Sequence, residues 1–389
     1  MSKTIVKFKD LKLNFYTYEG VVQALDGVDL EIREGETLGL VGETGCGKSV
    51  TGLALLDIIN PPGKIENGHV LFEVDGGTID ILQQHDAYLR KIRGEDISMI
   101  FQEPRAALNP VFTVNDQVSE VLFLHRKEEL CKNAIQQLEE EMRKKPWFIK
   151  RFILNREKGI YNKMLKNPYS LTVDILSAIP LIRRFKGRLK EEARKEVVKL
   201  LASLRIPDPD RVADMYPHEL SGGMAQRIVI AMALACRPVL LIADEPTTNL
   251  DVTVQAQILE LIKELKTNFH STILYITHDM GVVAEVCDRV AVMYAGNIVE
   301  IAEVFEVFKN PLHPYTIGLL QSIPRPGKEF VSIEGTVPSL IGPPKGCRFN
   351  PRCRYAMDVC TRVKPKLVEV KPNHFVHCYL CQQEELEIK

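Results

Sequence analysis

One stretch, Gly42–Ser49, has the glycine, lysine and serine spacing that is typical of a loop that binds nucleotide phosphates. It follows a short apolar run, 38–41, and precedes residues 50–59, which are compatible with a helix. Backbone N–H groups in such a loop can surround a phosphate, and the N-terminus of the following helix adds positive potential. We expect Lys48 to reach the β- and γ-phosphates and the Ser49 hydroxyl to ligate Mg²⁺.

Two carboxylates, Asp244 and Glu245, end a second apolar run at 239–243. Asp244 is placed to hold Mg²⁺, directly or through water, and Glu245 to orient or deprotonate the attacking water. A third run, 271–277, ends at His278. Unbroken apolar runs suit strands that are buried on both faces of a parallel sheet. Polar groups at their carboxyl ends indicate an open α/β fold with its ligand beyond the strand tips.

The size and charge of the chain exclude several classes of protein. Its 389 residues predict two or three domains. The 50 basic residues nearly balance the 51 acidic ones, so we expect no nucleic-acid partner. The longest apolar run, Ile228–Cys236, is shorter than the about 20 residues of a membrane span. The first residues lack the apolar core of a signal peptide, so we expect a cytosolic protein.

A third motif, Leu220–Met224, resembles the signature of ABC-type ATPases, and its Ser221 lies 23 residues before Asp244, as in that family. The ordered set of motifs comprises the phosphate loop, Gln102, the signature, Asp244, Glu245, Asp251 and His278. More narrowly, the chain resembles the ATPase subunits of oligopeptide/dipeptide permeases over nearly all of 1–385, except about 130–190. The stretch His313–Thr316 resembles part of the C-terminal extension of that subfamily.

The resemblance implies an α/β fold of the P-loop ABC type. It would comprise a RecA-like core, an antiparallel β subdomain and a helical subdomain, followed by a small metal-binding extension at the C-terminus. We expect the ATPase domain to cover 1–305, with a basic insertion at 126–195 in its helical subdomain. The extension would cover 306–389, where prolines become frequent.

The resemblance also implies a head-to-tail pair of ATPase subunits, distinct chains in vivo, with two ATP molecules between them. The contacts expected from the loop of one subunit are Gly42, Glu43, Thr44, Gly45, Cys46, Gly47, Lys48, Ser49 and Val50. The contacts expected from the other subunit are Ser221, Gly222, Gly223 and Asp251. Signature Ser221 and the two glycine amides, at a helix start, would cap the γ-phosphate.

Catalysis in this family implies roles for three further side chains. Glu245 would activate water, His278 would contact the γ-phosphate, and Gln102 would touch both Mg²⁺ and the water. The expected Mg²⁺ ligands are Ser49, Gln102 and Asp244. An aromatic residue upstream of the loop should stack on adenine, and family spacing favours Phe15 slightly over Tyr16.

Five of the nine cysteines fall within the last 43 residues, which in a reducing cytosol indicates a metal site more than disulfides. Cys347, Cys353, Cys360 and Cys378 are separated by 5, 6 and 17 residues. Four thiolates suit a cubane cluster or Zn²⁺, although structural zinc sites usually have closer cysteine pairs. The spacing resembles the [4Fe-4S]-binding segment of peptide-permease ATPases, with Cys381 to spare. Zn²⁺ and a site without metal remain as alternatives. We expect loss of a cluster to leave nucleotide binding in the distant cassette largely intact.

Residues 126–195 carry 19 Lys/Arg against 9 Asp/Glu. This segment is either a solvated helical elaboration or a contact with anionic lipid headgroups, with Trp147 and Phe148 at the interface.

Taken together, the resemblance implies an ATPase subunit at the cytoplasmic face of the cell membrane. It would couple Mg²⁺-ATP hydrolysis to uptake of oligopeptides or dipeptides. Its partners would be a second ATPase subunit, two transmembrane permease subunits and, indirectly, an extracytoplasmic solute-binding protein. An oligosaccharide importer is the alternative within transport. A non-transport ABC ATPase is disfavoured because the chain has one phosphate loop and one signature. A redox-sensing module built around the cysteines is a third hypothesis.

Overall fold

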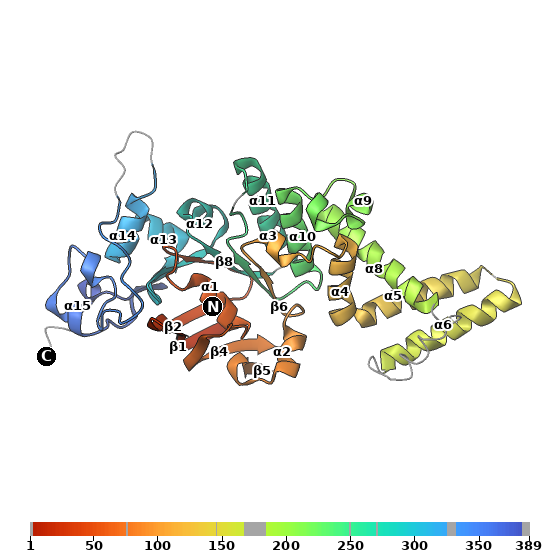
Figure 1. The fold of residues 1–389 in the computed structure, drawn as a ribbon, viewed down its shortest axis with the longest axis horizontal. Coiled ribbons are helices and arrows are strands. Elements are labelled where there is room, and N and C mark those ends of the chain that lie inside the picture. Colours follow the sequence, from red (N-terminus) through yellow and green to blue (C-terminus); the bar gives the residue numbers. More distant parts are fainter. Residues whose placement is uncertain are drawn as a thin grey trace. The chain divides into compact units, whose positions relative to one another are not determined.

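The computed structural model describes residues 3–74, 77–144, 146–166, 184–248, 250–269, 271–324 and 332–382. The chain forms two compact units (Figure 1), Met1–Arg93 with Val239–Lys389, and Gly94–Pro238. The expected boundary at 305/306 does not coincide with this division, since the residues that follow it belong to the same unit as the phosphate loop. Within the described part of the chain, no helix combines the length and apolar character needed to cross a membrane.

The first unit contains an antiparallel sheet with the strand order β2-β1-β4-β5. Its strands are β1 (Thr4–Thr17), β2 (Gly20–Arg33), β4 (Gly63–Val74) and β5 (Gly77–Asp80). Apolar residues at alternating positions, among them Leu11, Leu13 and Phe72, are buried on one face. This sheet agrees with the expected antiparallel β subdomain.

The second sheet of this unit has the order β11-β12-β10-β9-β3-β8-β7. Its strands are β3 (Thr37–Val41), β7 (Leu240–Asp244), β8 (Thr272–Thr277), β9 (Arg289–Tyr294), β10 (Asn297–Glu303), β11 (Val368–Lys371) and β12 (His374–Val376). Strands β9, β3, β8 and β7 are parallel, and every residue in them is buried. The three apolar runs are therefore neighbouring parallel strands, as predicted, and their carboxyl ends meet at one edge.

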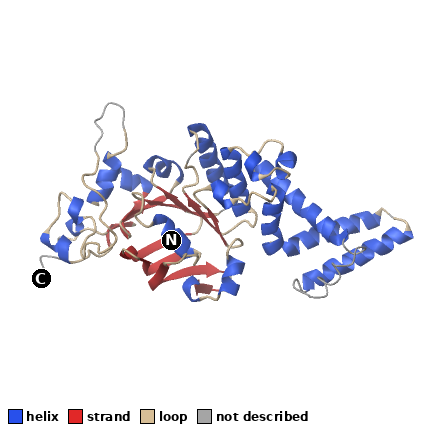
Figure 2. Cartoon of the chain, viewed as in Figure 1, coloured by secondary structure: helices blue, strands red, loops and turns tan. Residues whose placement is uncertain are grey.

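Helices cover this sheet, as Figure 2 shows. The helices of the first unit are α1 (Lys48–Leu55), α2 (Asp86–Ile92), α11 (Val252–Phe269), α12 (Met280–Val286), α13 (Val304–Lys309), α14 (Pro314–Gln321) and α15 (Asp358–Arg362). Helix α1 contacts strands of both sheets, and α12 packs on β3 and β8. The start of α1 is thus held firmly at the carboxyl end of β3, which is where a phosphate loop must lie.

The second unit is mainly helical. It contains β6 (Ile97–Ile100), α3 (Pro104–Ala107), α4 (Val114–His125), α5 (Lys127–Arg143), α6 (Phe148–Lys166), α8 (Arg184–Ser203), α9 (Pro209–Ala213) and α10 (Gly222–Leu234). Thr113 and Asp116 form a capping box that starts α4. This helical unit agrees with the expected helical subdomain.

The expected basic insertion comprises α5, α6 and part of α8, and its residues 145 and 167–183 lie outside the described part. Helices α5 and α6 pack against each other, and Lys158 pairs with Glu139 at 2.6 Å. Trp147 and Phe148 are 69% and 67% exposed. Exposure of this kind fits either interpretation of the insertion, so both stay predictions.

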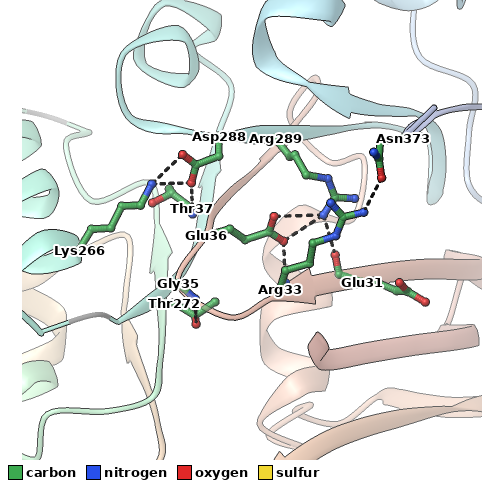
Figure 3. Close-up of polar contacts among 10 residues, drawn as sticks. All are labelled: Glu31, Arg33, Gly35, Glu36, Thr37, Lys266, Thr272, Asp288, Arg289 and Asn373. Carbon is green, nitrogen blue, oxygen red and sulfur yellow. Dashed lines mark hydrogen bonds and ion pairs between the residues drawn. The ribbon is translucent and has the colours of Figure 1, made fainter. Parts of the chain in front are cut away.

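A buried ion pair links strand β9 to the turn between β2 and β3 (Figure 3). Arg289 Nη1 donates to both carboxylate oxygens of Glu36, at 3.0 and 3.2 Å, and the Arg33 N–H donates to the same carboxylate at 2.7 Å. Thr37 N–H donates to Asp288, which also pairs with Lys266. Because one buried charge is matched by the other, the pair fixes how the turn enters β3.

The C-terminal extension packs onto the larger sheet. Glu300 in β10 is fully buried and accepts hydrogen bonds from the N–H groups of Leu312 and His313, both at 2.9 Å. His374 Nε2 in β12 lies 2.7 Å from the same carboxylate. Although burial disfavours the charged form, these bonds outweigh it and hold the pKa of Glu300 below its usual value. The buried Glu300 carboxylate therefore anchors the extension to β10 at two places, at residues 312–313 and at His374.

Candidate nucleotide-binding site

The predicted phosphate loop joins β3 to α1, as expected. Gly47 has a φ of 106°, and a Cβ there would lie 2.9 Å from the Ala24 carbonyl oxygen. Only glycine fits both the left-handed backbone and this close approach. At Gly42, a Cβ would lie 2.1 Å from the Met293 carbonyl oxygen. The glycines are therefore required by the packing of the loop against β2 and β9.

Lys48 lies inside the loop. Its Nζ donates to the carbonyl oxygens of Gly42 at 2.8 Å and Glu43 at 3.1 Å, and the residue is 5% exposed. A lysine held this way places one positive charge where the motif predicts the phosphates.

The two expected Mg²⁺ ligands of this unit lie together. Ser49 Oγ donates to Asp244 Oδ1 at 3.1 Å. Burial raises the pKa of Asp244 above its ordinary value, and the hydrogen bond from Ser49 offsets only part of that effect. A hydroxyl beside a buried carboxylate is an oxygen donor set that suits Mg²⁺, which would neutralise the carboxylate and part of the phosphate charge when bound.

Glu245 and His278 also meet, at the ends of β7 and β8. His278 Nδ1 lies 3.0 Å from Glu245 Oε1, and Thr248 Oγ1 donates to Glu245 Oε2 at 3.0 Å. Burial opposes the charged form, but these two hydrogen bonds outweigh it and lower the pKa of Glu245. The carboxylate is thus ionised and oriented, as a general base requires. Glu245 has a φ of 45°, a conformation that is costly for a residue with a side chain and common at functional sites.

Thr248 was missed by the sequence reasoning. Its position three residues after Glu245, in a turn, is the signal that could have found it, because a hydroxyl at that spacing reaches back to the carboxylate. Asp251 is exposed and its carboxylate accepts from Val254 N–H at 2.9 Å, so it caps α11.

The signature residues and Gln102 belong to the second unit. Ser221 is the N-cap of α10 and accepts from Met224 N–H at 3.3 Å. Gly222 and Gly223 form the first turn of that helix. Ser221, Gly222 and Gln102 are exposed. A long helix that begins with an exposed serine and two glycines presents free backbone N–H groups that suit an anion.

The two candidate aromatic residues differ in their surroundings. Tyr16 is 48% exposed, and its hydroxyl donates to Glu66 at 2.8 Å. Phe15 is half-buried and lies on the same side of β1 as Leu13. Leu13 pairs with Leu25, whose side chain lies against Gly47 of the loop. Phe15 is therefore on the side of β1 that faces the phosphate loop.

The four predicted cysteines line one pocket, together with Tyr379. Cys381 does not line it. Burial raises the pKa of the Cys347 thiol to about 11 and that of Cys378 to about 12. Within the described residues, no three His, Cys, Asp or Glu side chains are arranged to hold a metal ion. The shared pocket brings the four predicted cysteines together, and which metal they would hold stays a prediction.

The sequence reasoning also missed two residues that contact the phosphate loop from the extension. Arg352 forms an ion pair with Glu43 at 2.7 Å, and Tyr315 Oη accepts from Glu43 N–H at 3.0 Å. The expectation of a distant extension is therefore wrong. Nothing local could have revealed these contacts, because 309 and 272 residues separate the partners.

Comparisons with known proteins agree with this geometry. Residues 25–248 match the ABC transporter family model, and residues 299–360 match that of the oligopeptide/dipeptide transporter C-terminal region. The dipeptide transport ATP-binding protein DppD of Bacillus subtilis is 42% identical, over 97% of this chain and 95% of its own. The oligopeptide transport ATP-binding protein OppD of the same organism is 41% identical, over 99% and 91%.

Solved structures give the same fold. The dimeric ATP-binding cassette MJ0796, in a post-hydrolysis state bound to ADP and Pi, is 25% identical with a TM-score of 0.54, and covers 77% of this chain and 99% of its own. The cbiO1 subunit from Clostridium perfringens, part of the ABC transporter complex cbiONQ, is 26% identical with a TM-score of 0.52, over 79% and 92%. Fold and site together define an ABC-type ATPase cassette. The chain belongs to the ABC transporter family and carries the C-terminal region of its oligopeptide/dipeptide branch.

Proposed function

We propose that this chain is the ATP-hydrolysing subunit of an importer for oligopeptides or dipeptides. The observation that carries the proposal is the placement of Glu245, which His278 and Thr248 hold at 3.0 Å each, one residue after the Asp244–Ser49 pair. The match of residues 299–360 to the oligopeptide/dipeptide region supports peptides over oligosaccharides as the solute. One phosphate loop and one signature speak against the non-transport alternative.

In the proposed reaction, Lys48 and the loop amides bind the phosphates, and Ser49, Asp244 and Gln102 hold Mg²⁺. Glu245 takes a proton from the attacking water, and His278 keeps the carboxylate oriented and contacts the γ-phosphate. Phe15 stacks on adenine, because it lies on the side of β1 that faces the loop.

The second half of each ATP site comes from a second ATPase subunit, which we propose is a related but distinct chain in vivo. Ser221, Gly222 and Gly223 would contact the γ-phosphate from that side, and Asp251 would lie at the interface. The exposed N-cap of α10 supports this assignment. ATP would then join two subunits, and hydrolysis would release them.

The extension holds a [4Fe-4S] cluster in this proposal, with Cys347, Cys353, Cys360 and Cys378 as ligands. The pocket that these four residues share supports the ligand set. The cluster would staple a segment that has little core of its own. Zn²⁺ is the alternative, and the intervals of 5 and 6 residues between the first three cysteines speak against it, because structural zinc sites usually have closer cysteine pairs.

We further propose that the chain works at the cytoplasmic face of the membrane, bound to two permease subunits and served by an extracytoplasmic solute-binding protein. The test is transport in proteoliposomes that contain the whole complex. ATP-dependent accumulation of a labelled oligopeptide, with none of a labelled oligosaccharide, is the expected result. Accumulation of the oligosaccharide alone would contradict the proposed solute, and no ATP-dependent uptake of either would contradict the transport role.

A further inference from the structure

Two residues of the C-terminal extension bind Glu43, the second residue of the phosphate loop. Arg352 forms a bidentate pair with its carboxylate, with Nη1–Oε2 at 2.7 Å and Nη2–Oε1 at 3.2 Å. Tyr315, in the first turn of α14, accepts a hydrogen bond from the Glu43 N–H at 3.0 Å. Paired N–H···O bonds of this kind are among the strongest and most directional in proteins.

Arg352 is itself rigidly held. Its side chain is 5% exposed, and its Nε donates to the Glu334 carbonyl oxygen at 3.0 Å. Nη1 also lies 3.3 Å from the Tyr294 hydroxyl, and Nη2 donates to the Ile333 carbonyl oxygen at 3.4 Å. A guanidinium with this many partners has one orientation. Arg352 therefore holds the loop at a fixed position, which a mobile surface charge would not do.

Tyr315 is equally constrained. It is fully buried, and its ring lies 4.6 Å from that of Tyr294 in β9 and 5.5 Å from that of Phe349. Phe349 precedes the short 3-10 turn Asn350–Arg352, which carries Arg352. The two contacts to Glu43 thus come from one aromatic cluster, so they move together with the extension.

These contacts reach the phosphate-binding lysine through Glu43. The Glu43 N–H is bound by Tyr315, its carboxylate by Arg352, and its carbonyl oxygen accepts from Lys48 Nζ at 3.1 Å. The same carboxylate would repel a triphosphate in the loop if its charge were not matched. Arg352 removes that repulsion and leaves Lys48 as the cation available to the phosphates.

We propose that the C-terminal extension is part of the nucleotide site, with Arg352 and Tyr315 as positioning residues that act on ATP through Glu43. The proposal rests on the ATP binding assigned under the proposed function and adds a role for the extension in that step. Because Arg352 immediately precedes Cys353, a disturbance of the cysteine pocket is also expected to reach the loop.

The test is the ATP affinity of variants, measured by equilibrium titration on the full chain in the non-hydrolysing Glu245→Gln background. Arg352→Met leaves the Glu43 charge unmatched and is expected to weaken ATP binding about tenfold or more. Adding Glu43→Gln removes that charge and is expected to bring the affinity back to within about threefold of the parent. Recovery by a second substitution cannot come from general instability or from the cysteine pocket. Tyr315→Phe keeps the ring and is expected to weaken binding about threefold.

Arg354→Met is the matched control. Arg354 lies on the other side of Cys353, is 70% exposed and pairs with the exposed Glu334 side chain. The ATP affinity of the Arg354→Met variant should equal that of the parent. Parent-like affinity of Arg352→Met, or a double variant as weak as the single one, would overturn the proposal. If the parent itself binds no ATP, the proposed function fails instead, and the two failures are thereby distinguished.

Discussion

Ser49 and Asp244, 195 residues apart in the chain, meet in a hydrogen bond of 3.1 Å between Oγ and Oδ1. Ser49 lies in the first turn of α1, and Asp244 ends β7. The bond exists because β3 and β7 flank β8 in one parallel sheet and deliver their carboxyl ends to the same edge. Glu245 and His278 are brought together at that edge by the same rule. The proposed chemistry of the site follows from this meeting of strand ends.

Lys48→Ala should weaken ATP binding at least about tenfold, because it removes the one cation that the loop itself supplies to the phosphates. An equilibrium titration with ATP measures the effect. Lys263→Ala, a half-exposed lysine in α11 that pairs with Glu285, is the control and should bind as the parent does. Unchanged affinity of Lys48→Ala would remove the lysine from the phosphate site.

His278→Ala should shift the acid side of the pH–kcat profile to higher pH. Burial alone would raise the pKa of Glu245, and the hydrogen bond with His278 is among the contacts that lower it. Without that bond the pKa rises, so the active carboxylate is lost sooner as pH falls. His69→Ala, an exposed histidine paired with Asp80 in the other sheet, should leave the profile unchanged. A profile of unaltered position in His278→Ala would contradict the role of His278 in holding Glu245.

Glu300→Gln should loosen the attachment of the extension to β10 by about 2 kcal/mol at pH 7, since a buried carboxylate loses charge-assisted hydrogen bonds. Hydrogen exchange in β10 and β12 measures it. The folded pKa of Glu300 is lowered, so this stabilisation is present above the unfolded pKa of about 4.3 and is lost as pH falls through the folded value. The difference in this stability between the Glu300→Gln variant and the parent should therefore become smaller at acidic pH. Glu303→Gln, exposed at the end of β10, should show no such loss.

The cysteine variants test the metal assignment. Anaerobically purified protein should be brown and carry about four irons per chain. Serine at any of the four cysteines of the pocket should abolish the iron, whereas Cys381→Ser should retain it, because Cys381 does not line that pocket. Iron analysis and the absorbance spectrum measure both. Colourless protein with one zinc, or iron lost only with Cys381→Ser, would contradict the assignment.

The parts of the site that lie at strand ends could be predicted from the sequence, because unbroken apolar runs mark buried parallel strands and the polar residues follow them directly. Glu245 and His278 are examples. The contacts of Arg352 and Tyr315 with Glu43 could not, because they depend on how a proline-rich segment without periodicity folds back onto β9. The packing of the extension on the larger sheet could not be predicted for the same reason. The extension shares a buried carboxylate, Glu300, with the sheet, and composition carries no sign of such a contact.

The most direct test of the account is ATP hydrolysis by Glu245→Gln. The substitution removes the charge that activates water and leaves Lys48, Ser49 and Asp244 in place. We predict an ATP affinity within about threefold of the parent and a kcat at least about 100-fold lower, with the variant accumulating as an ATP-bound dimer in light scattering. Steady-state phosphate release near the parent rate, in a variant that binds ATP normally, would contradict the assignment of Glu245 as the catalytic base.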